Sequence, residues 1–495
     1  MAESEKLGER VHNLYEESVD TMRGWFNGAE PDEAATGLLE EDEDVERGPH
    51  EDEDVEPPPP TSPIRRSCAA VDPRKALHLF CYFLPSFFTR LIGLNSEDSE
   101  IAAANSTSYL NGLRGIASLV VAFQHNLVDF RMVFHGWGET ATDHYIMQLP
   151  FIRLMTNGLF MVCVFFVISG FALTYGPLKK IYAKQNDAAI SSFPSSIFRR
   201  PIRLFLPVVP VLMMTIFSIN IQTFRRGGRI HPPIPNGLVG QLSYFWQQLV
   251  IIITVGKIDS IMPQGWTLAA EFQGSLLVFT CTLAFARTSP KVRIPCVLMI
   301  TAFFYSLGLW QSCLFLAGML LADLRHLRAK LPSPTGKFKI VADVAPWLLL
   351  FVALFLGGWP IEGDPYKATH YGWLAWVPTW PLAPWQFFLS FSAITLVAAL
   401  ESLPILQRGL NCKFVLYLGE ISYGLYLLHW LVAYVGLTMG LKYRLVAVGH
   451  SLQFSSALVV ALSMFLAFWA ADVHWRMIDK KSVKFAHWLS KKCGV

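Results

Sequence analysis

Residues 109–126 read YLNGLRGIASLVVAFQHN, an apolar stretch that carries an arginine and a histidine. Arg114 and His125 are eleven residues apart, about 16 Å and almost three whole turns of an α-helix, so both side chains should share one face. An ionisable group inside an apolar helix is costly unless it meets a partner or a water-filled cavity. The stretch predicts a membrane span with Arg114 at its mouth and His125 about halfway through. A purely structural histidine, bonded to a neighbouring helix, is the alternative.

The composition of the whole chain also points to a membrane. Of 495 residues, 53% are hydrophobic and only 16% are charged, which is typical of a polytopic membrane protein. A net charge of +3 without a zinc-finger or phosphate-loop motif argues against nucleic acid as a partner. The eight cysteines form no CxxC pair, so we expect neither a metal site nor a disulfide framework.

The first part of the chain differs from the rest. EDEDVE occurs at residues 41–46 and again at 51–56, before a proline run, and such sequence buries too little apolar area to fold. Residues 7–26 have helical apolar spacing, and the short apolar run 76–89 favours an interfacial helix. The expected divisions are a disordered acidic cytoplasmic tail at 1–70, an interfacial helix and linker at 71–107, a membrane domain at 108–485 and a basic cytoplasmic tail at 486–495.

The membrane domain is expected to be all-α, a polytopic bundle of about ten transmembrane helices, because a span needs roughly 20 apolar residues. The run at 244–256 is doubtful and is treated as re-entrant. The expected spans lie near 111–131, 158–176, 203–221, 266–286, 295–311, 312–324, 344–358, 386–401, 414–436 and 453–474.

This topology places both termini on one side of the membrane. Most basic loops lie on that side, so the positive-inside rule makes it cytoplasmic. The cluster of Arg225, Arg226 and Arg229 is the exception. The supporting residues are Lys179, Lys180, Lys184, Arg199, Arg200, Arg325, Arg328, Lys330, Lys337, Lys339, Lys480, Lys481, Lys484, Lys491 and Lys492.

Several polar residues near the expected spans are candidates for catalysis. Asp129 follows His125 by one turn and would orient the imidazole, unless it only marks a solvated helix end. Glu271, in PQGWTLAAEFQGS at 263–275, enters the membrane and needs a partner. GEISYGLYLLHW at 419–430 carries a polar stripe, which also fits simple helix association. The stripe consists of Glu420, Ser422, Tyr423, Tyr426 and His429.

The segment FRRPIRLFLP at 198–207 supplies clustered arginines. Arg199 and Arg203 are four residues apart, with Arg200 beside them, and a proline near a helix start permits helical geometry. Together with Arg114 they would clamp an anionic ligand such as a phosphorylated cofactor, because arginine binds phosphate in bidentate fashion. Topology alone also explains each of them.

Five motifs in order resemble the integral-membrane acyltransferase 3 family over roughly residues 108–485. The resemblance implies about ten helices that move an acyl group, commonly acetyl, from a cytoplasmic coenzyme A thioester to a hydroxyl of a sugar, lipid or metabolite. It matches Arg114 and His125 to the family's essential pair, and Arg199 and Arg203 to its arginine motif. The motifs are NGLRGIASLVVAFQH, FFVISGF at 165–171, FRRPIRLFLP, GWTLAAE and ISYGLYLLH.

The chain departs from the family pattern at three places. Asn111 stands where aspartate is frequent, Thr267 where serine is common, and DVHWRMIDKK at 472–481 replaces a Glu-x-Pro ending. We expect none of these changes to alter the family assignment.

The expected mechanism has His125 as the base that deprotonates the acceptor hydroxyl, directly or through an acyl intermediate, with Asp129 or Glu271 orienting it. Ser422 and the tyrosines of the stripe would donate hydrogen bonds to the thioester oxyanion. The alternatives are a transporter or flippase that uses the same cavity, and a scaffold that works through its acidic tail. A different acyltransferase family with a histidine in a late span, here His429, is the nearest enzymatic rival.

Overall fold

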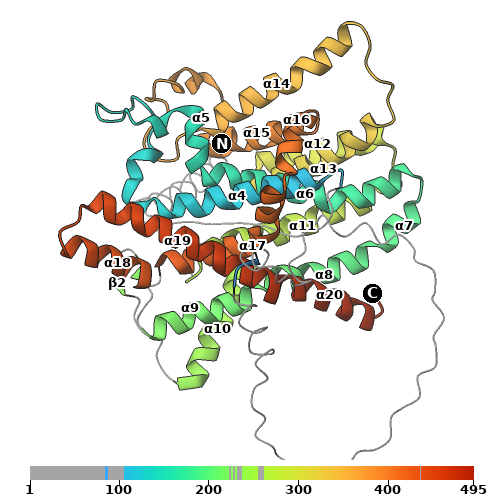
Figure 1. The fold of residues 1–495 in the computed structure, drawn as a ribbon. Helices are drawn as coiled ribbons and strands as arrows, with labels where there is room; N and C mark the ends of the chain where they lie inside the picture. The colour runs from blue at the N-terminus through green and yellow to red at the C-terminus, as the bar shows by residue number, and fades with distance from the viewer. Residues whose placement is uncertain are drawn as a thin grey trace, which may run out of the picture.

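The computed structural model describes residues 84–86, 105–221, 225–226, 229–230, 237–254, 261–434 and 436–495. The regular structure in these ranges is a bundle of helices (Figure 1). Its only strands are β1 (Arg225–Arg226) and β2 (Arg229–Ile230), a two-residue antiparallel pair. The all-α prediction therefore describes the bundle and misses one hairpin too short to leave a sequence pattern.

Helix α6 (Gly158–Tyr182) lies at the centre of the bundle. It packs against α4 (Ser108–Asn126), α11 (Trp266–Ala284), α13 (Trp310–Arg328) and α15 (Pro384–Leu400). Its sequence is apolar on every side, as in a helix that crosses a membrane or lies in a protein core, and most of it is buried by its neighbours. The core of the bundle therefore forms around α6.

Glycines allow α6 and α13 to touch backbone to backbone. A Cβ atom on Gly170 would lie 2.1 Å from the carbonyl oxygen of Phe315, and one on Gly318 would lie 2.2 Å from that of Val167. Small residues at such crossings let membrane helices approach closely and gain van der Waals contact. Any side chain at these two positions would force the helices apart.

Backbone contacts at glycines also join α4 to α17 (Lys413–Tyr434). A Cβ atom on Gly115 would lie 2.4 Å from the amide nitrogen of Gly419, and one on Gly419 would lie 2.5 Å from the carbonyl oxygen of Asn111. The polar face of α4 is thus pressed against the polar stripe of α17. This contact positions the candidate site.

The bundle has two chemically different ends. At the end where α6 and α13 finish, which we call the basic end, Arg325 bonds Glu401 beyond α15 and the carbonyl oxygen of Ser106 before α4. At the opposite end, which we call the loop end, Asn157 before α6 donates to the carbonyl oxygen of Gly357, the last residue of α14 (Lys337–Gly357). Helix α4 therefore begins at the basic end and finishes at the loop end.

Six helical segments in the described ranges are long and apolar enough to cross a membrane. A seventh is added if α15 and α16 (Pro404–Leu410), bent by 101°, form one span. The chain therefore has the helices of a multi-pass membrane protein. The six segments are Gly158–Tyr182, Asn186–Asn220, Pro263–Ala284, Lys337–Gly357, Lys413–Tyr434 and Leu452–Lys492.

The expected number of about ten spans remains a prediction. Helices α4 and α13 are more polar than these six segments and α12 (Pro290–Ser306) is shorter, so none of the three is counted among them. The first expected span, at 111–131, extends beyond the helix that the structure contains. Helix α4 ends at Asn126 and a 3₁₀ segment (Val128–Phe134) follows, so His125 lies in the last turn rather than halfway through.

Two further expected segments differ from the structure in their limits. The expected span at 203–221 is divided between α8 (Phe193–Phe205) and α9 (Val208–Asn220) at Leu206 and Pro207. The doubtful run at 244–256 lies mostly in α10 (Gly237–Thr254).

The remaining helices are α5 (Pro150–Arg153), α7 (Asn186–Ser191), α18 (Gly436–Ala447), α19 (Leu452–His474) and α20 (Lys480–Lys492). Short turns lie at Ile146–Gln148, Leu154–Thr156, Pro263–Gly265, Gly372–Trp376 and Trp475–Asp479.

The expected helix at 7–26, the acidic repeats and most of the run at 76–89 lie outside the described residues. Residues 84–86 are described, and they are bound to the end of α19. Ser86 donates its amide to Asp472 Oδ2 at 2.9 Å, while Arg476 forms a buried ion pair with Asp472 at 2.7 Å. This anchor falls inside the segment at 472–481 where the chain departs from its family pattern.

Candidate active site

Arg114 is buried between α4 and α17. Its Nε donates to Ser422 Oγ at 3.2 Å, and its terminal nitrogen donates to the carbonyl oxygen of Gly419 at 3.2 Å and to Asn111 Oδ1. The carbonyl is within reach because the glycine contact brings the two backbones together. Arg114 therefore finds its partners on α17, and the phosphate clamp expected for it stays a prediction.

Glu271 finds the partner that a buried carboxylate needs in Arg200. The two side chains form an ion pair with side-chain exposures of only 1% and 4%, and Arg200 Nε also donates to Ser275 Oγ at 2.8 Å. Arg114 also acts electrostatically on this carboxylate. The structure thus joins α4, α8 and α11 through one buried charged group. Arg200 bonds Oε1 of this carboxylate, while Oε2 has no hydrogen-bond partner among the described residues, and the orienting role expected for Glu271 stays a prediction.

His125 packs against a second histidine. Its ring stacks on that of His429 with centroids 5.3 Å apart and an interplanar angle of 22°, and it meets the edge of Trp430 at 5.6 Å. Both histidines are buried. Because α4 and α17 are aligned by their glycine contact, Arg114 and His125 both face α17, as the helical spacing predicted.

The hydrogen bond of His429 defines which of its nitrogens is basic. Nδ1 lies 3.2 Å from the carbonyl oxygen of Leu425, and a carbonyl only accepts, so Nδ1 carries the hydrogen. In the neutral ring Nε2 is then the atom with the lone pair. Among the described residues Nε2 has no hydrogen-bond partner. Beside His125, this lone pair makes His429 a second proton acceptor in the site.

The hydroxyl groups of the polar stripe are already bonded. Ser422 donates to the carbonyl oxygen of Gly419 at 2.6 Å, Tyr423 to that of Leu204 and Tyr426 to that of Gln264. Buried hydroxyl groups usually satisfy themselves on the nearest backbone carbonyl. These bonds help to fix α17 within the bundle, and the oxyanion role expected for the three groups stays a prediction.

One donor next to the histidines does lack a partner. The indole nitrogen of Trp430 is buried and, within the described ranges, makes no hydrogen bond. The ring of Trp430 lies 5.6 Å from that of His125, at an interplanar angle of 70°. In the sequence Trp430 is only the end of a motif, and nothing in its spacing distinguishes it from an apolar core residue.

The arginines of α8 have different partners. Helix α8 continues through Pro201, as expected, but its arginines diverge: Arg200 meets α11, whereas Arg199 contacts the ring nitrogens of His487 on α20 at 2.8 and 3.0 Å. Arg203 is buried on the same helix. The side chain of Asp129 is not among those that the structure describes.

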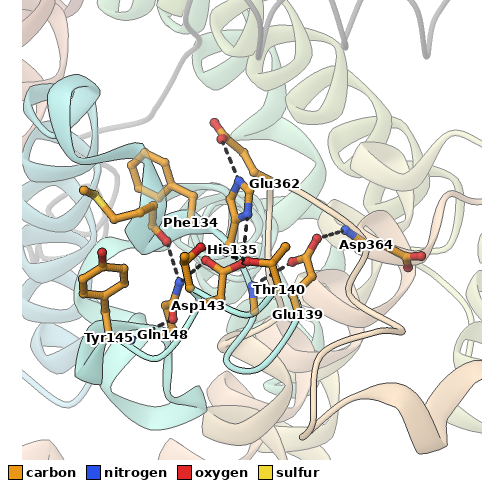
Figure 2. A network of polar contacts seen from close by, with 12 residues as sticks. Phe134, His135, Glu139, Thr140, Asp143, Tyr145, Gln148, Glu362 and Asp364 are labelled. Atoms are coloured by element: carbon orange, nitrogen blue, oxygen red, sulfur yellow. Dashed lines mark hydrogen bonds and ion pairs between the residues drawn. The ribbon is translucent and has the colours of Figure 1, made fainter.

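A network of polar side chains covers the loop end, beyond the last turn of α4 (Figure 2). His135 Nδ1 lies 3.6 Å from Asp143 Oδ2, and His135 Nε2 lies 3.9 Å from Glu362 Oε2. The two carboxylates come from two different loops. Gln148 donates to Asp143 at 2.8 Å. Burial alone would raise the pKa of Asp143, but hydrogen bonds from Thr140 and Gln148, together with the nearby His135, hold it below its ordinary value.

We expect Asp143→Asn to destabilise the protein at neutral pH by about 1–3 kcal/mol, because its hydrogen bonds are made to a charged group. Since the pKa of Asp143 is lowered in the folded state, its ionised form stabilises the fold above its unfolded pKa. That stabilisation is lost as the pH falls through the folded pKa. Thermal unfolding in detergent should show the wild-type advantage at about pH 7 and a smaller one at about pH 3. An advantage of equal size at both pH values would contradict this.

Taken together, the described chain is a multi-pass helix bundle with a buried pair of histidines near one end and buried arginines deeper inside. A model of an acyltransferase domain, acyltransferase 3, matches residues 107–476. The chain therefore belongs to the acyltransferase 3 family and is an acyltransferase that transfers groups other than amino-acyl groups. This confirms the resemblance carried by the five motifs.

Curated relatives agree with this assignment. O-acetyltransferase PaAT-1 of Phomopsis amygdali is 28% identical over 435 residues, which cover 80% of this chain and 86% of the relative. Acyltransferase clz18 of Cochliobolus lunatus is 20% identical over 66% of this chain and 82% of its own length. Acyltransferase MdmB of Streptomyces mycarofaciens is 24% identical over 72% and 85%. No solved structure matches the chain.

Proposed function

We propose that the protein is a membrane-bound O-acyltransferase that moves an acetyl group from acetyl-coenzyme A to a hydroxyl of a carbohydrate, lipid or secondary metabolite. The family assignment supports acyl transfer, and the name of the Phomopsis relative, an O-acetyltransferase, supports an oxygen acceptor and an acetyl group. The transporter, flippase and scaffold alternatives have no comparable support, because they do not account for the family match.

The buried histidine pair is the observation that carries this proposal. Charging both rings would place two positive charges about 5 Å apart in a buried site, so the pair is suited to accept one proton at a time. We assign His125 as the general base, with His429 stacked against it to stabilise the protonated ring. The base takes the proton of the acceptor hydroxyl, whose oxygen bonds the acyl carbon while the carbon–sulfur bond breaks. The proton then passes to the departing thiolate.

Trp430 is the residue best placed to stabilise the charge that develops on the acyl oxygen. Its indole N–H is buried and unpartnered among the described residues, and its ring lies 5.6 Å from that of His125. A preorganised donor in a site without water stabilises an oxyanion strongly, because it needs no reorganisation when the charge appears. Trp430 would add to the donors expected from Ser422, Tyr423 and Tyr426, whose role stays a prediction.

The buried arginines supply the charge that an anionic acyl donor requires. Arg114 acts electrostatically on Glu271, and Arg203 is buried on α8 three residues after Arg200. We propose that these arginines attract the coenzyme A phosphates. Arg199 has the different role of holding α8 to α20 through His487.

We further propose that the basic end faces the cytoplasm and that both termini lie there. Lys179, Lys180, Arg328 and Lys330 all lie where α6 and α13 finish. The positive-inside rule assigns such an end to the cytoplasm. The domain divisions follow the same topology, with residues 108–485 as the catalytic domain.

The direct test is to incubate the purified, reconstituted protein with acetyl-labelled coenzyme A and a mixture of hydroxylated metabolites. We expect labelled ester to form together with one equivalent of free thiol. Movement of a solute across the vesicle membrane without loss of thioester would instead establish the transporter alternative. Identifying the labelled product would also name the acceptor.

A further inference from the structure

The basic end contains a cavity that the proposed acyl transfer does not use. Its volume is about 450 Å³, and it is walled by the end of α6, the segment 286–290 that leads from α11 into α12, and the end of α13 with the residues that follow. Cavities of about 300–1,000 Å³ are the usual size of small-molecule sites. No carboxylate lines it among the described residues, whereas four cationic side chains do: Lys184, Arg287, Arg293 and Lys330.

The two arginines of the cavity differ in how firmly they are neutralised. Arg293 is fully buried and donates hydrogen bonds of 2.6 and 2.7 Å to Asp323, so this pair shapes the wall. Arg287 pairs with Asp187 at 2.9 Å, but the two side chains are 74% and 91% exposed. Exposed pairs of this kind are weak and are screened by salt, so Arg287 can exchange its partner for another anion.

The two lysines are held at the cavity by their surroundings. Lys330 donates to the carbonyl oxygen of Tyr182 and lies over the ring of that tyrosine at 5.0 Å. Lys184 has a φ of 64° and is the only residue other than glycine with a positive φ in the described part of the chain. Glycine normally occupies this position after a helix, so a lysine there indicates a use for its side chain.

The cavity lies at the level where a membrane span ends. Tyr182, which lines it, is the last residue of the candidate span Gly158–Tyr182, and Lys184 follows two residues later. On the elements that wall the cavity, Leu283 in the last turn of α11 and Val292 in the first turn of α12 are 41% and 51% exposed. Cations that border exposed apolar side chains at a span end match the boundary between lipid headgroups and acyl chains.

The start of α12 also favours an anion at the cavity. Ser289 is the N-cap residue of this helix and lines the cavity, yet its side chain makes no capping bond. The N-terminus of a helix carries a partial positive charge. Its field adds to that of the lysines and Arg287, and together these groups have the chemistry that binds phosphate.

We propose that this cavity binds the phosphorylated headgroup of an anionic membrane lipid, whose acyl chains lie against α11 and α12. Basic pockets between transmembrane helices on the cytoplasmic side bind such headgroups in other membrane proteins. A free phosphate would meet the same cations, but it has no use for the apolar side chains beside them.

The site goes beyond the proposed acyl transfer and does not depend on it. The cavity lies at the basic end, whereas the histidine pair lies near the loop end, so the bound lipid would be neither acyl donor nor acceptor. Its walls come from α6, α12 and α13, and a lipid between them would hold these three helices together.

The test is a calorimetric titration of the purified full chain in uncharged detergent with dioctanoyl phosphatidylinositol 4-phosphate at low ionic strength. We expect Lys184→Gly and Lys330→Met each to raise the Kd by about tenfold, because each removes a charge-assisted contact. Lys179→Ala removes the same charge from the last turn of α6 without lining the cavity, and its Kd should match that of the wild type. An equal loss of affinity in Lys179→Ala would show only a general attraction to the basic end and would overturn the proposal.

Lys184→Gly also separates charge from folding. Glycine adopts a positive φ without strain, so this variant without lipid should unfold at the same temperature as the wild type or higher. Saturating lipid should raise the unfolding temperature of the wild type, and the same lipid concentration should raise that of the variant less. Unchanged affinity in both cavity variants would place the lipid elsewhere and contradict the assignment.

Two soluble probes distinguish a lipid from a free phosphate. Inositol 1,4-bisphosphate carries two phosphates on the same sugar ring without acyl chains, and inorganic phosphate lacks the ring as well. We expect each to bind about tenfold more weakly than the lipid, because neither contacts the apolar side chains of α11 and α12. A soluble probe that bound as tightly as the lipid would make the cavity a site for free phosphate and refute the lipid assignment.

Discussion

Replacement of His125 by alanine is expected to lower the rate of acyl transfer by about 10²- to 10⁴-fold, the usual contribution of a positioned general base. His125 is buried and stacked on His429, so the alanine variant loses the proton acceptor that lies beside the unpartnered Trp430. His125→Gln, which fills more of the space, should be as inactive while retaining more of the wild-type stability. Labelled acetyl transfer and thermal unfolding, measured on the same samples, give the two readouts.

The controls separate catalysis from packing. His144→Ala removes an exposed histidine near the loop end and should leave the rate unchanged. His429→Phe keeps an aromatic ring stacked on His125 but removes both nitrogens, so a lowered rate there tests the stabilising role of His429. Full activity of His125→Gln would exclude His125 as the base. Loss of folded protein in both His125 variants, in place of activity, would show a structural histidine.

Breaking the ion pair between Arg200 and Glu271 is expected to destabilise the protein by about 3–5 kcal/mol, because either change leaves a buried charge without its partner. Arg200→Met should therefore lower the unfolding temperature in detergent far more than Arg287→Ala, which breaks an exposed pair. The same variant should also bind the acyl donor less well.

The double variant Arg200→Met with Glu271→Leu distinguishes folding from function. Replacing both charges by apolar groups is often neutral for stability, so much of the lost stability should return. If Arg200 also attracts the donor, activity should stay low in this stable protein. Wild-type activity in the double variant would show that the pair serves only the fold.

The sequence predicted correctly the features that depend on the spacing of residues within one helix. The spacing of Arg114 and His125 predicted that they share a face, and both do contact α17. Hydropathy located the helices well but said little about where each one ends. His125 was therefore predicted to lie about halfway through a span, because apolar residues continue after Asn126 although the helix ends there.

Contacts between residues that are far apart in the sequence could not be predicted from spacing or hydropathy. Glu271 clearly needed a partner, but Arg200 lies 71 positions earlier, and only the packing of α8 on α11 brings them together. The hydroxyl of Tyr423 looked available because Leu204, whose carbonyl it bonds, belongs to another helix. The orphaned N–H of Trp430 is recognisable only when every neighbouring acceptor has been placed.

The opposite placement of the basic end and the histidine pair has a consequence for traffic across the bilayer. Lys179, Lys180 and Arg328 lie at the basic end, whereas His125 occupies the last turn of α4, near the loop end. Phosphate groups cross a hydrocarbon layer at great cost, but a neutral two-carbon group does not. With coenzyme A retained on one side, only the acetyl group would need to traverse the protein. Acetylation would then be vectorial, marking acceptors on the far side without exporting any of the donor.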